Sequence, residues 1–478
     1  MNTVRCLLAA CCLAALAAWP ALAGVSPKAP LVTIYNQGFA LIEETRSLSL
    51  PAGTGTVEFP DVPETIVAAS ARLRSLTAPD TLTVTETAYD YDLITPAALL
   101  NRYLGKNLKV VLPDPTDKNA KIVKDARLLS NNERPIFETD QGVYLGSYDA
   151  VIFPETPKGL RDKPALVLGV DNKGPAEQVV QAAYLADGFS WRADYTLWLD
   201  PAGDKAAFDC LATIANQTGK AITGAELRLV AGEVRREEHV MGQPRAAARN
   251  AAAPGLAMAM ADAQVQEEPV FEYHLFRLER PVDLGSRQTK QLALFSAQDV
   301  GVEKELRSRF DVRLADRSEG RPEEPLRQTT TVSLKIKNDA KNNLGRPLPA
   351  GVARVYQRGA SGETVFLGED TLPQLSQGGE AKLALGAASG IQIERRLADY
   401  KKIGKNTVSA AWEITVKSGT TSPAMLILED RYPGSFTLKR SSQNQTGSDA
   451  RALRFAVPLA RIGPDKPFVL TYEAEYEQ

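Results

Sequence analysis

Hydrophobic and polar residues alternate with a period of two along much of this chain. In Thr407–Lys417 every second residue is apolar, and the same pattern recurs in Thr331–Lys337 and Leu470–Glu477. Because successive side chains of a strand point to opposite faces, the pattern predicts strands with one buried and one solvated face. Turns rich in Gly, Pro, Asn and Asp separate these runs. We therefore expect a mainly β fold, with several antiparallel β-sandwich or small-barrel domains and very little helix.

The clearest helical segment runs from Pro96 to Leu104. Thr95 precedes it as a candidate N-cap, Pro96 takes the first helical position, and Gly105 is the stop signal. Its apolar residues recur at three- and four-residue spacing, which predicts one short helix packed on a sheet.

A strand is also predicted after Gly188, from Trp191 to Leu199. Its odd-numbered residues are apolar or aromatic and predict a core face. On the other face, Arg192 lies two residues from Asp194. We interpret these two side chains as an exposed ion pair that adds little stability.

The organisation along the chain follows from shifts in these patterns. The segment 241–266 lacks strand alternation and is rich in Ala, Met and Pro, so we expect a flexible insertion. The alternative is a helix that forms when the segment meets a partner or a membrane. The expected regions are a signal peptide (1–23), an N-terminal β domain (24–95), a short helix with a small β-barrel or meander (96–175), a β-sandwich that carries the insertion (176–330) and a C-terminal β-sandwich (331–478).

The N-terminus has the features of a secretory signal peptide. Arg5 precedes an apolar stretch, and Ala21-Leu22-Ala23 forms an A-x-A cleavage site. We expect cleavage after Ala23 and a periplasmic or secreted protein. A single membrane anchor and a lipoprotein signal at Cys11 are the alternatives. No later apolar segment is long enough to span a bilayer, so we expect no transmembrane segment in the mature chain.

Export would leave a single cysteine. Cys6, Cys11 and Cys12 belong to the expected signal peptide, and Cys210 remains in an apolar, strand-like run. A lone cysteine in such a run is typically a small core residue. We therefore expect Cys210 to be structural rather than a nucleophile.

Charge and composition narrow the possible functions. The 478 residues include 56 Lys and Arg and 58 Asp and Glu, which gives no cationic field for nucleic acid. The only two histidines, His239 and His274, lack the spacing of metal ligands. We expect no metal site, no cofactor and no catalytic residues that a motif would identify.

Three stretches have some features of a functional site, and each has a simpler interpretation. Tyr89-Asp90-Tyr91-Asp92 could line a sugar site, but alternating Tyr and Asp is also typical of a strand end with one wet face. Charges of both signs crowd 303–327, which indicates a solvated strand followed by a polar loop at 316–324. Gly188-Phe189-Ser190-Trp191-Arg192 lacks the closing glycine of a hydrolase nucleophile elbow.

Four segments resemble a bacterial family called domain of unknown function 4139. They are Ile34–Leu41, Tyr184–Tyr195, Leu229–Gly232, and Pro347–Gly351 with the nearby Val355-Tyr356-Gln357. Some relatives are described as mucoidy-inhibitor-like, which implies envelope polysaccharide biology. Those relatives carry a long coiled coil, and this chain has no sustained heptads. The resemblance supports the expected β-rich fold and an exported protein. No catalytic residue of the family can be transferred to this chain.

Three functional hypotheses follow. The first is a soluble, non-enzymatic envelope protein that binds or scaffolds an unknown envelope protein or glycan, with no nucleic acid as partner. The alternative is a carboxylate-based hydrolase of envelope glycans, which would need two facing carboxylates in a cleft. The third gives the insertion at 241–266 the leading role, as a segment that folds on binding.

Overall fold

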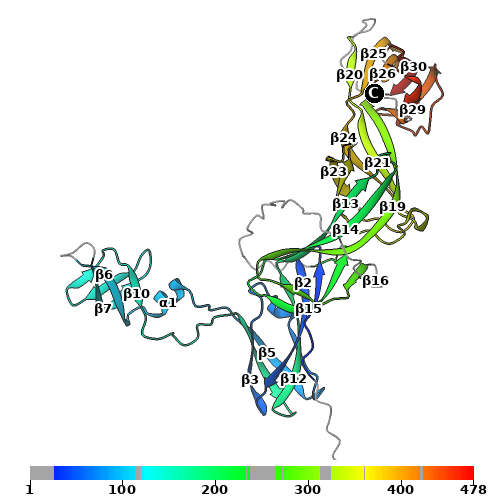
Figure 1. Ribbon diagram of the computed structural model, residues 1–478. Coiled ribbons are helices and arrows are strands. Elements are labelled where there is room, and N and C mark those ends of the chain that lie inside the picture. Colours follow the sequence, from blue (N-terminus) through cyan, green and yellow to red (C-terminus); the bar gives the residue numbers. More distant parts are fainter. Residues whose placement is uncertain are drawn as a thin grey trace, which may run out of the picture. The chain divides into compact units, whose positions relative to one another are not determined.

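The computed structural model describes residues 26–114, 120–232, 234–236, 265–270, 273–312, 324–359, 361–419, 424–463 and 465–477 (Figure 1). The expected signal peptide and most of the 241–266 insertion lie outside these residues. The mainly β prediction is confirmed: in the described part, one α-helix and three short 3₁₀ helices accompany strands β1 to β30. No described helix has the length and apolar character needed to cross a membrane.

The chain divides into two compact units. Unit 1 comprises residues 1–31 and 41–186, and unit 2 comprises residues 32–40 and 187–478. A strand that straddles a boundary is assigned here to the unit that holds most of it.

Unit 1 contains three sets of hydrogen-bonded strands. One joins β2 (Phe39–Ser49), β12 (Glu177–Asp187) and β4 (Arg72–Ser75), and a second places β11 (Ala165–Asn172) between β3 (Gly53–Pro60) and β5 (Leu82–Asp90). The 3₁₀ helix η1 (Ala68–Ser70) precedes β4.

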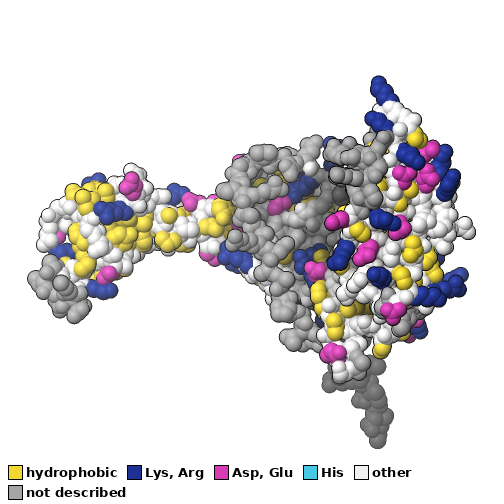
Figure 2. All heavy atoms as spheres, turned by 90° about the horizontal axis from the view of Figure 1, so that it is seen from above, with side chains coloured by type: hydrophobic (Ala, Val, Ile, Leu, Met, Phe, Trp, Pro, Cys, Tyr) yellow, Lys and Arg dark blue, Asp and Glu magenta, His cyan; other side chains and the backbone are white. Residues whose placement is uncertain are grey.

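The third set is an open five-stranded sheet that follows the helix. Strands β6 to β9 form a meander, with β10 beside β6, so the meander alternative holds and no closed barrel forms. Val123 and Val143 of this sheet are exposed. Figure 2 shows hydrophobic side chains gathered on the surface of this part of the chain. The strand bounds are Asn107–Pro113, Lys121–Ser130, Ile136–Thr139, Gly142–Tyr144 and Ala150–Ile152.

The helix α1 (Pro96–Arg102) starts where the sequence predicted. Thr95 Oγ1 accepts a hydrogen bond from the Ala98 backbone N–H at 3.1 Å. The helix ends two residues earlier than predicted, and Gly105 then takes a left-handed conformation at φ 74°. Tyr103 is buried in the core of the five-stranded sheet.

Unit 2 is built around a long curved sheet. Its strands run in the order β23-β22-β13-β14-β19-β21-β24, and β27 and β29 extend it from β19. The end strands β23 and β24 lie side by side, since Asp370 Oδ2 accepts from the Ala384 N–H at 2.7 Å. No ladder joins these two strands in the described residues, so the sheet stays open. The bounds are Thr364–Leu372 (β23), Gly351–Arg358 (β22), Phe189–Leu199 (β13), Lys205–Asn216 (β14), Gln288–Asp311 (β19), Thr331–Lys337 (β21), Glu380–Ala387 (β24), Met425–Arg431 (β27) and Ala452–Pro458 (β29).

A second group of strands in unit 2 joins β1 (Leu31–Tyr35), β15 (Ile222–Ala231), β17 (Tyr273–Leu278) and β16 (Val265–Val270) in that order, with β18 (Val282–Leu284) also paired to β15. Strand β16 begins at Val265. The last two residues of the expected insertion are therefore strand residues, which corrects the prediction that 241–266 lacks strand structure throughout.

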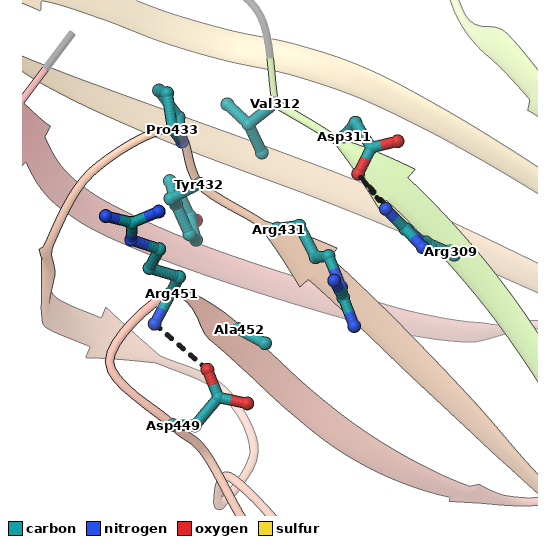
Figure 3. Close-up of a pocket in the computed structure, with 9 residues that line it drawn as sticks. All are labelled: Arg309, Asp311, Val312, Arg431, Tyr432, Pro433, Asp449, Arg451 and Ala452. Carbon is teal, nitrogen blue, oxygen red and sulfur yellow. Dashed lines mark hydrogen bonds and ion pairs between the residues drawn. The ribbon is translucent and has the colours of Figure 1, made fainter. Parts of the chain in front are cut away.

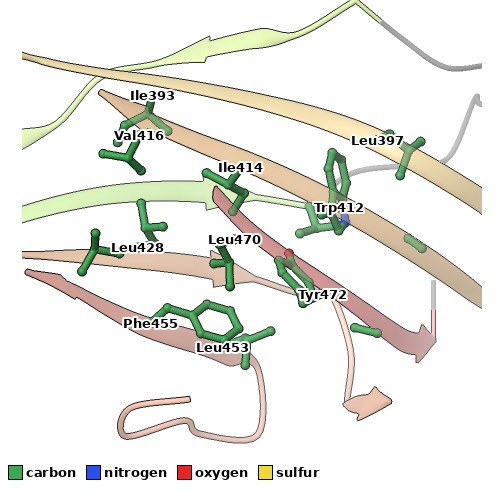
Figure 4. Close-up of a cluster of buried hydrophobic side chains, with 14 of the residues drawn as sticks. Ile393, Leu397, Trp412, Ile414, Val416, Leu428, Leu453, Phe455, Leu470 and Tyr472 are labelled. Atoms are coloured by element: carbon green, nitrogen blue, oxygen red, sulfur yellow. The ribbon is translucent and has the colours of Figure 1, made fainter. Parts of the chain in front are cut away.

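The C-terminal part packs a five-stranded sheet on strands β19, β27 and β29. This sheet runs in the order β20-β25-β26-β30-β28. Figure 4 shows the core between the two layers, where Trp412, Leu428 and Phe455 interdigitate. The predicted alternation in Thr407–Lys417 and Leu470–Glu477 is confirmed, because their apolar residues enter this core. The bounds are Leu326–Gln328, Ile391–Lys402, Thr407–Ser418, Phe468–Glu477 and Phe436–Ser441, with 3₁₀ helices η2 (Ala340–Asn342) and η3 (Leu459–Arg461).

Candidate anion-binding site

A buried carboxylate surrounded by arginines lies on the face of β27 that points away from the C-terminal core. Glu429 on β27 is 1% exposed and accepts hydrogen bonds from Arg307 at 2.7 Å, Arg431 at 2.9 Å and Arg454 at 2.8 Å. The strand register explains the convergence, because Arg454 of β29 stands directly opposite Glu429. Burial opposes ionisation of Glu429, but the arginines outweigh it and hold its pKa below the usual value.

The next residue on β27, Asp430, points to the other face of the strand. It accepts hydrogen bonds from the guanidinium of Arg395 and from the hydroxyl of Tyr472, and all three residues are buried. The Arg395 guanidinium also lies 4.4 Å from the centre of the Phe310 ring. Burial, and then the nearby Asp430, raise the pKa of Tyr472 well above its ordinary value. This cluster is a closed, fully satisfied ion pair and has no access for a ligand.

A hollow opens at the surface beside the Glu429 cluster. It has a volume of about 460 Å³ and receives three arginines from three segments: Arg309 of β19, Arg431 of β27 and Arg451 ahead of β29 (Figure 3). We call it the arginine hollow. The full lining is Arg309, Asp311, Val312, Arg431, Tyr432, Pro433, Asp449, Arg451 and Ala452.

The two carboxylates of the arginine hollow are already engaged. Asp311 Oδ1 accepts from Arg309 Nη2 at 3.0 Å, and Asp449 Oδ2 accepts from Arg454 Nη2 at 2.9 Å. Asp449 also accepts from the Arg451 backbone N–H at 3.0 Å, and this bond, with Arg454, lowers the pKa of Asp449. Both carboxylates are about half exposed. An exposed aspartate with a lowered pKa is ionised at neutral pH and is a poor proton donor.

Positive charge exceeds negative charge in and behind the arginine hollow. Among the described residues, five guanidinium groups face three carboxylates. The carboxylate of Glu305 also contacts Arg307, but its charge is balanced by an ion pair with Lys382. The Arg451 side chain is exposed and has no carboxylate partner in the described part of the chain. Arginine offers a fork of N–H donors that suits carboxylate and phosphate oxygens. The arrangement can therefore bind an anionic group. The groups counted are Arg307, Arg309, Arg431, Arg451 and Arg454 against Asp311, Glu429 and Asp449.

The segments that resemble domain of unknown function 4139 meet in another place, within unit 2. Trp191 Nε1 donates to Val230 O at 2.9 Å, and Tyr195 Oη donates to Pro349 O at 2.6 Å. Asn36 and Ala231 also line the small hollow of about 190 Å³ that forms there. Through these hydrogen bonds the motif residues hold neighbouring strands together.

A comparison with known families supports the resemblance of these segments to the family. The model of a family described as domain of unknown function (DUF4139) matches residues 180–439. The chain belongs to the DUF4139 family. A search of curated proteins found no match. The DUF4139 match includes Arg307, Glu429 and Arg431, but it ends before Asp449 and Arg451, so the family model covers only part of the arginine hollow.

One sequence-based interpretation in this DUF4139 chain is wrong. Asp194 is not part of an exposed pair, because its side chain is only 5% exposed and accepts from both Arg192 at 3.1 Å and Arg354 at 3.0 Å. Arg354 comes from β22, which lies parallel to β13. Burial opposes ionisation of Asp194, but Thr213 and the two arginines lower its pKa overall. The core face of β13, by contrast, is buried as predicted.

Two other predictions are confirmed. Tyr89 and Asp90 end β5, as expected of a strand end, and Asp90 accepts from Arg161 at 2.7 Å while the Tyr89 hydroxyl donates to Glu64 O at 2.9 Å. Cys210 is fully buried on β14, and burial strongly raises the pKa of its thiol. A protonated, inaccessible thiol is a core residue.

The histidines give no further site in the described residues. His274 lies on β17, and His239 lies outside the described part of the chain. No group of three His, Cys, Asp or Glu side chains that could hold a metal occurs among the described residues.

Sequence reasoning missed the arginine hollow. The charged stretch 303–327 was interpreted as a solvated strand and polar loop, and its strand, β19, does run to Asp311. Yet Arg307 on this strand pairs with Glu429, which is 122 residues away. No local spacing signals such a pair. The one available hint was Glu429, an acidic residue that directly follows the apolar run Met425–Leu428.

Proposed function

We propose that this DUF4139 protein is an exported, non-enzymatic binding or scaffold protein of the cell envelope, and that its ligand carries negative charge. The observation that carries the proposal is the exposed Arg451 guanidinium, which has no carboxylate partner in the described residues and lies in a hollow with two other arginines. The features of the first 23 residues support export.

The buried charges behind the hollow favour binding over chemistry. Glu429 holds Arg431 in place, and Arg309 is held by Asp311, so two of the three lining arginines are oriented before a ligand arrives. Preorganised donors reduce the entropy cost of binding. Because the arginines are exposed, we expect binding to weaken as salt rises.

The alternative of a glycan hydrolase has less support. Such an enzyme needs one carboxylic acid that stays protonated and a second carboxylate that faces it. The two carboxylates of the arginine hollow are exposed and paired with arginines, and the pKa of Asp449 is lowered. Neither has the environment of a general acid.

The proposal is tested by titrating the chain from Gly24 with tetragalacturonate and, separately, with a hexaglutamate peptide at low salt. The two probes distinguish an acidic glycan from an acidic protein segment. We expect Arg451→Ala to weaken binding of the preferred probe by about tenfold or more, since it removes charge-assisted hydrogen bonds. Arg440→Ala is the matched control, because Arg440 is also exposed, on β28, but lies outside the hollow.

Equal losses in the two variants would mean that only net charge matters and would contradict a site at the hollow. Absence of binding to both probes would contradict an anionic ligand.

A further inference from the structure

Three aromatic side chains form a row across the outer face of the curved sheet in unit 2. Trp198 of β13, Tyr356 of β22 and Phe366 of β23 are register partners, so they lie on the same face of the sheet. The ring centres of Trp198 and Tyr356 are 4.9 Å apart, with planes 25° from parallel, and those of Tyr356 and Phe366 are 5.3 Å apart. Phe366 is 53% exposed, and the other two rings are half-buried.

This row does not belong to the hydrophobic core. The neighbours of Trp198 along β13, Leu197 and Leu199, point to the opposite face and are buried there. Three adjacent rings that keep part of their surface in water form an apolar strip on a face that otherwise carries charges.

A polar row runs beside the aromatic one on the same face, two residues back along β13 and β22. It joins Asp209, Thr196, Arg354 and Glu369 on four neighbouring strands. Arg354 Nε forms an ion pair with Glu369 Oε2 at 3.0 Å. Neither the Asp209 carboxylate nor the Thr196 hydroxyl has a hydrogen-bond partner among the described residues, and burial raises the pKa of Asp209. The row therefore offers both donors and acceptors.

The chemistry of the two rows points to one class of ligand. Strands lie about 4.8 Å apart, so three rings span roughly 10 Å, enough for two consecutive sugar rings to stack. The apolar faces of sugars stack on aromatic rings, while hydroxyl groups both donate and accept, as the polar row requires. We propose that this face binds a neutral glycan chain, with its sugar rings on Trp198, Tyr356 and Phe366 and its hydroxyls on the polar row.

The local charges do not favour a polyanion at this face. Three carboxylates, those of Asp194, Asp209 and Glu369, face two guanidinium groups, those of Arg192 and Arg354. Arg358, two residues beyond Tyr356 on β22, adds a third guanidinium. The charges at this face therefore balance, whereas the arginine hollow has a positive excess. The two sites share no residue, and the glycan proposal goes beyond the anion-binding function.

The fluorescence of Trp198 provides a direct probe of ligand binding at this face. The chain from Gly24 has three tryptophans, and Trp191 and Trp412 are buried, so Trp198 is the one that an aqueous quencher reaches. Cellotetraose, maltotetraose and chitotetraose serve as neutral ligands, and tetragalacturonate serves as the charged counterpart. We expect at least one neutral tetrasaccharide to protect Trp198 from acrylamide quenching in a saturable way, and tetragalacturonate to give no protection.

Variants localise the effect. Phe366→Ala should weaken binding of the protective sugar by at least about fivefold, as expected for loss of a stacking ring. Val143→Ala removes an equally exposed apolar side chain from the β6–β10 sheet and should leave binding unchanged. Circular dichroism checks that each variant is folded. If Phe366→Ala does not fold, Asp209→Asn replaces it, and this variant should also weaken binding.

The proposal is wrong if no neutral tetrasaccharide protects Trp198, if tetragalacturonate protects it better, or if binding is unaffected by the substitutions in the two rows. Because Arg451→Ala leaves this face intact, it should weaken only the anionic probe. Failure of one site is therefore distinguishable from failure of the other.

Discussion

At the scale of single residues, the two adjacent acidic side chains of β27 perform different tasks. Asp430 is sealed in the core with Arg395, whereas Glu429 faces the arginines beside the surface hollow. Strand geometry separates them, since neighbouring residues point to opposite faces. We therefore expect substitution of Asp430 to affect stability alone and substitution of Glu429 to affect both stability and ligand binding.

Asp430→Ala should destabilise the protein by about 3–5 kcal/mol, because it leaves the buried Arg395 guanidinium without its counter-ion. The free energy of unfolding is measured by denaturant titration. Asp399→Ala is the control on β25, the strand that carries Arg395, where Asp399 pairs with Lys401 and both side chains are exposed. Its cost should stay below about 1 kcal/mol. Similar losses in the two variants would contradict the burial of the pair.

Glu429→Gln should make the free energy of unfolding depend less on pH in the acid range. The folded state lowers the pKa of Glu429 below its ordinary value of about 4.5. Its charge therefore contributes stability above that pH, and the contribution is lost as pH falls toward the folded-state pKa. The difference in unfolding free energy between wild type and variant should be largest at neutral pH and should shrink in acid. A difference that grows in acid would contradict this assignment.

Cys210 should be unreactive in the folded protein. Burial raises the pKa of its thiol, so the thiol stays protonated at neutral and mildly alkaline pH. In the chain from Gly24, which has no other cysteine, Ellman's reagent should label one thiol only after denaturation. Rapid labelling of the native protein would show that the β14 core opens.

At the scale of the elements, the hydrophobic pattern predicts where some strands and the helix begin, but it does not predict which strands pair. The strand Thr331–Lys337 has the bounds that its alternation predicted, and the Thr95 cap starts α1 as expected. Local period and capping chemistry decide such elements. The partners of the strands were not predictable, because the parallel pairing of β13 with β22 joins residues more than 150 positions apart. Both candidate sites depend on such pairings, and so neither was found from the sequence.

Gly351 tests that parallel pairing. A Cβ atom at this position would lie 2.2 Å from Ala193 O, so Gly351→Ala should force β22 away from β13 and cost about 1–3 kcal/mol. Gly463→Ala is the control, since a Cβ there meets no atom within 4 Å. Its effect on thermal unfolding should be small. A neutral Gly351→Ala variant would contradict the close contact between the two strands.

At the scale of the whole molecule, this DUF4139 chain devotes most of its residues to sheets whose inner faces form cores. The chemically distinctive groups lie at sheet edges and outer faces: a positively charged hollow at the C-terminal sandwich and an aromatic row on the curved sheet. These groups are the basis of our proposal that the protein binds its ligands and leaves them chemically unchanged.

The most direct test combines binding with analysis of the ligand. The chain from Gly24 and its Arg451→Ala variant are titrated by calorimetry with tetragalacturonate and with hexaglutamate, and each probe is then examined by mass spectrometry. The account predicts saturable binding of at least one probe to the wild type, weaker binding to the variant, and a probe recovered at its original mass. Absence of saturable binding, or recovery of shortened fragments, would contradict it.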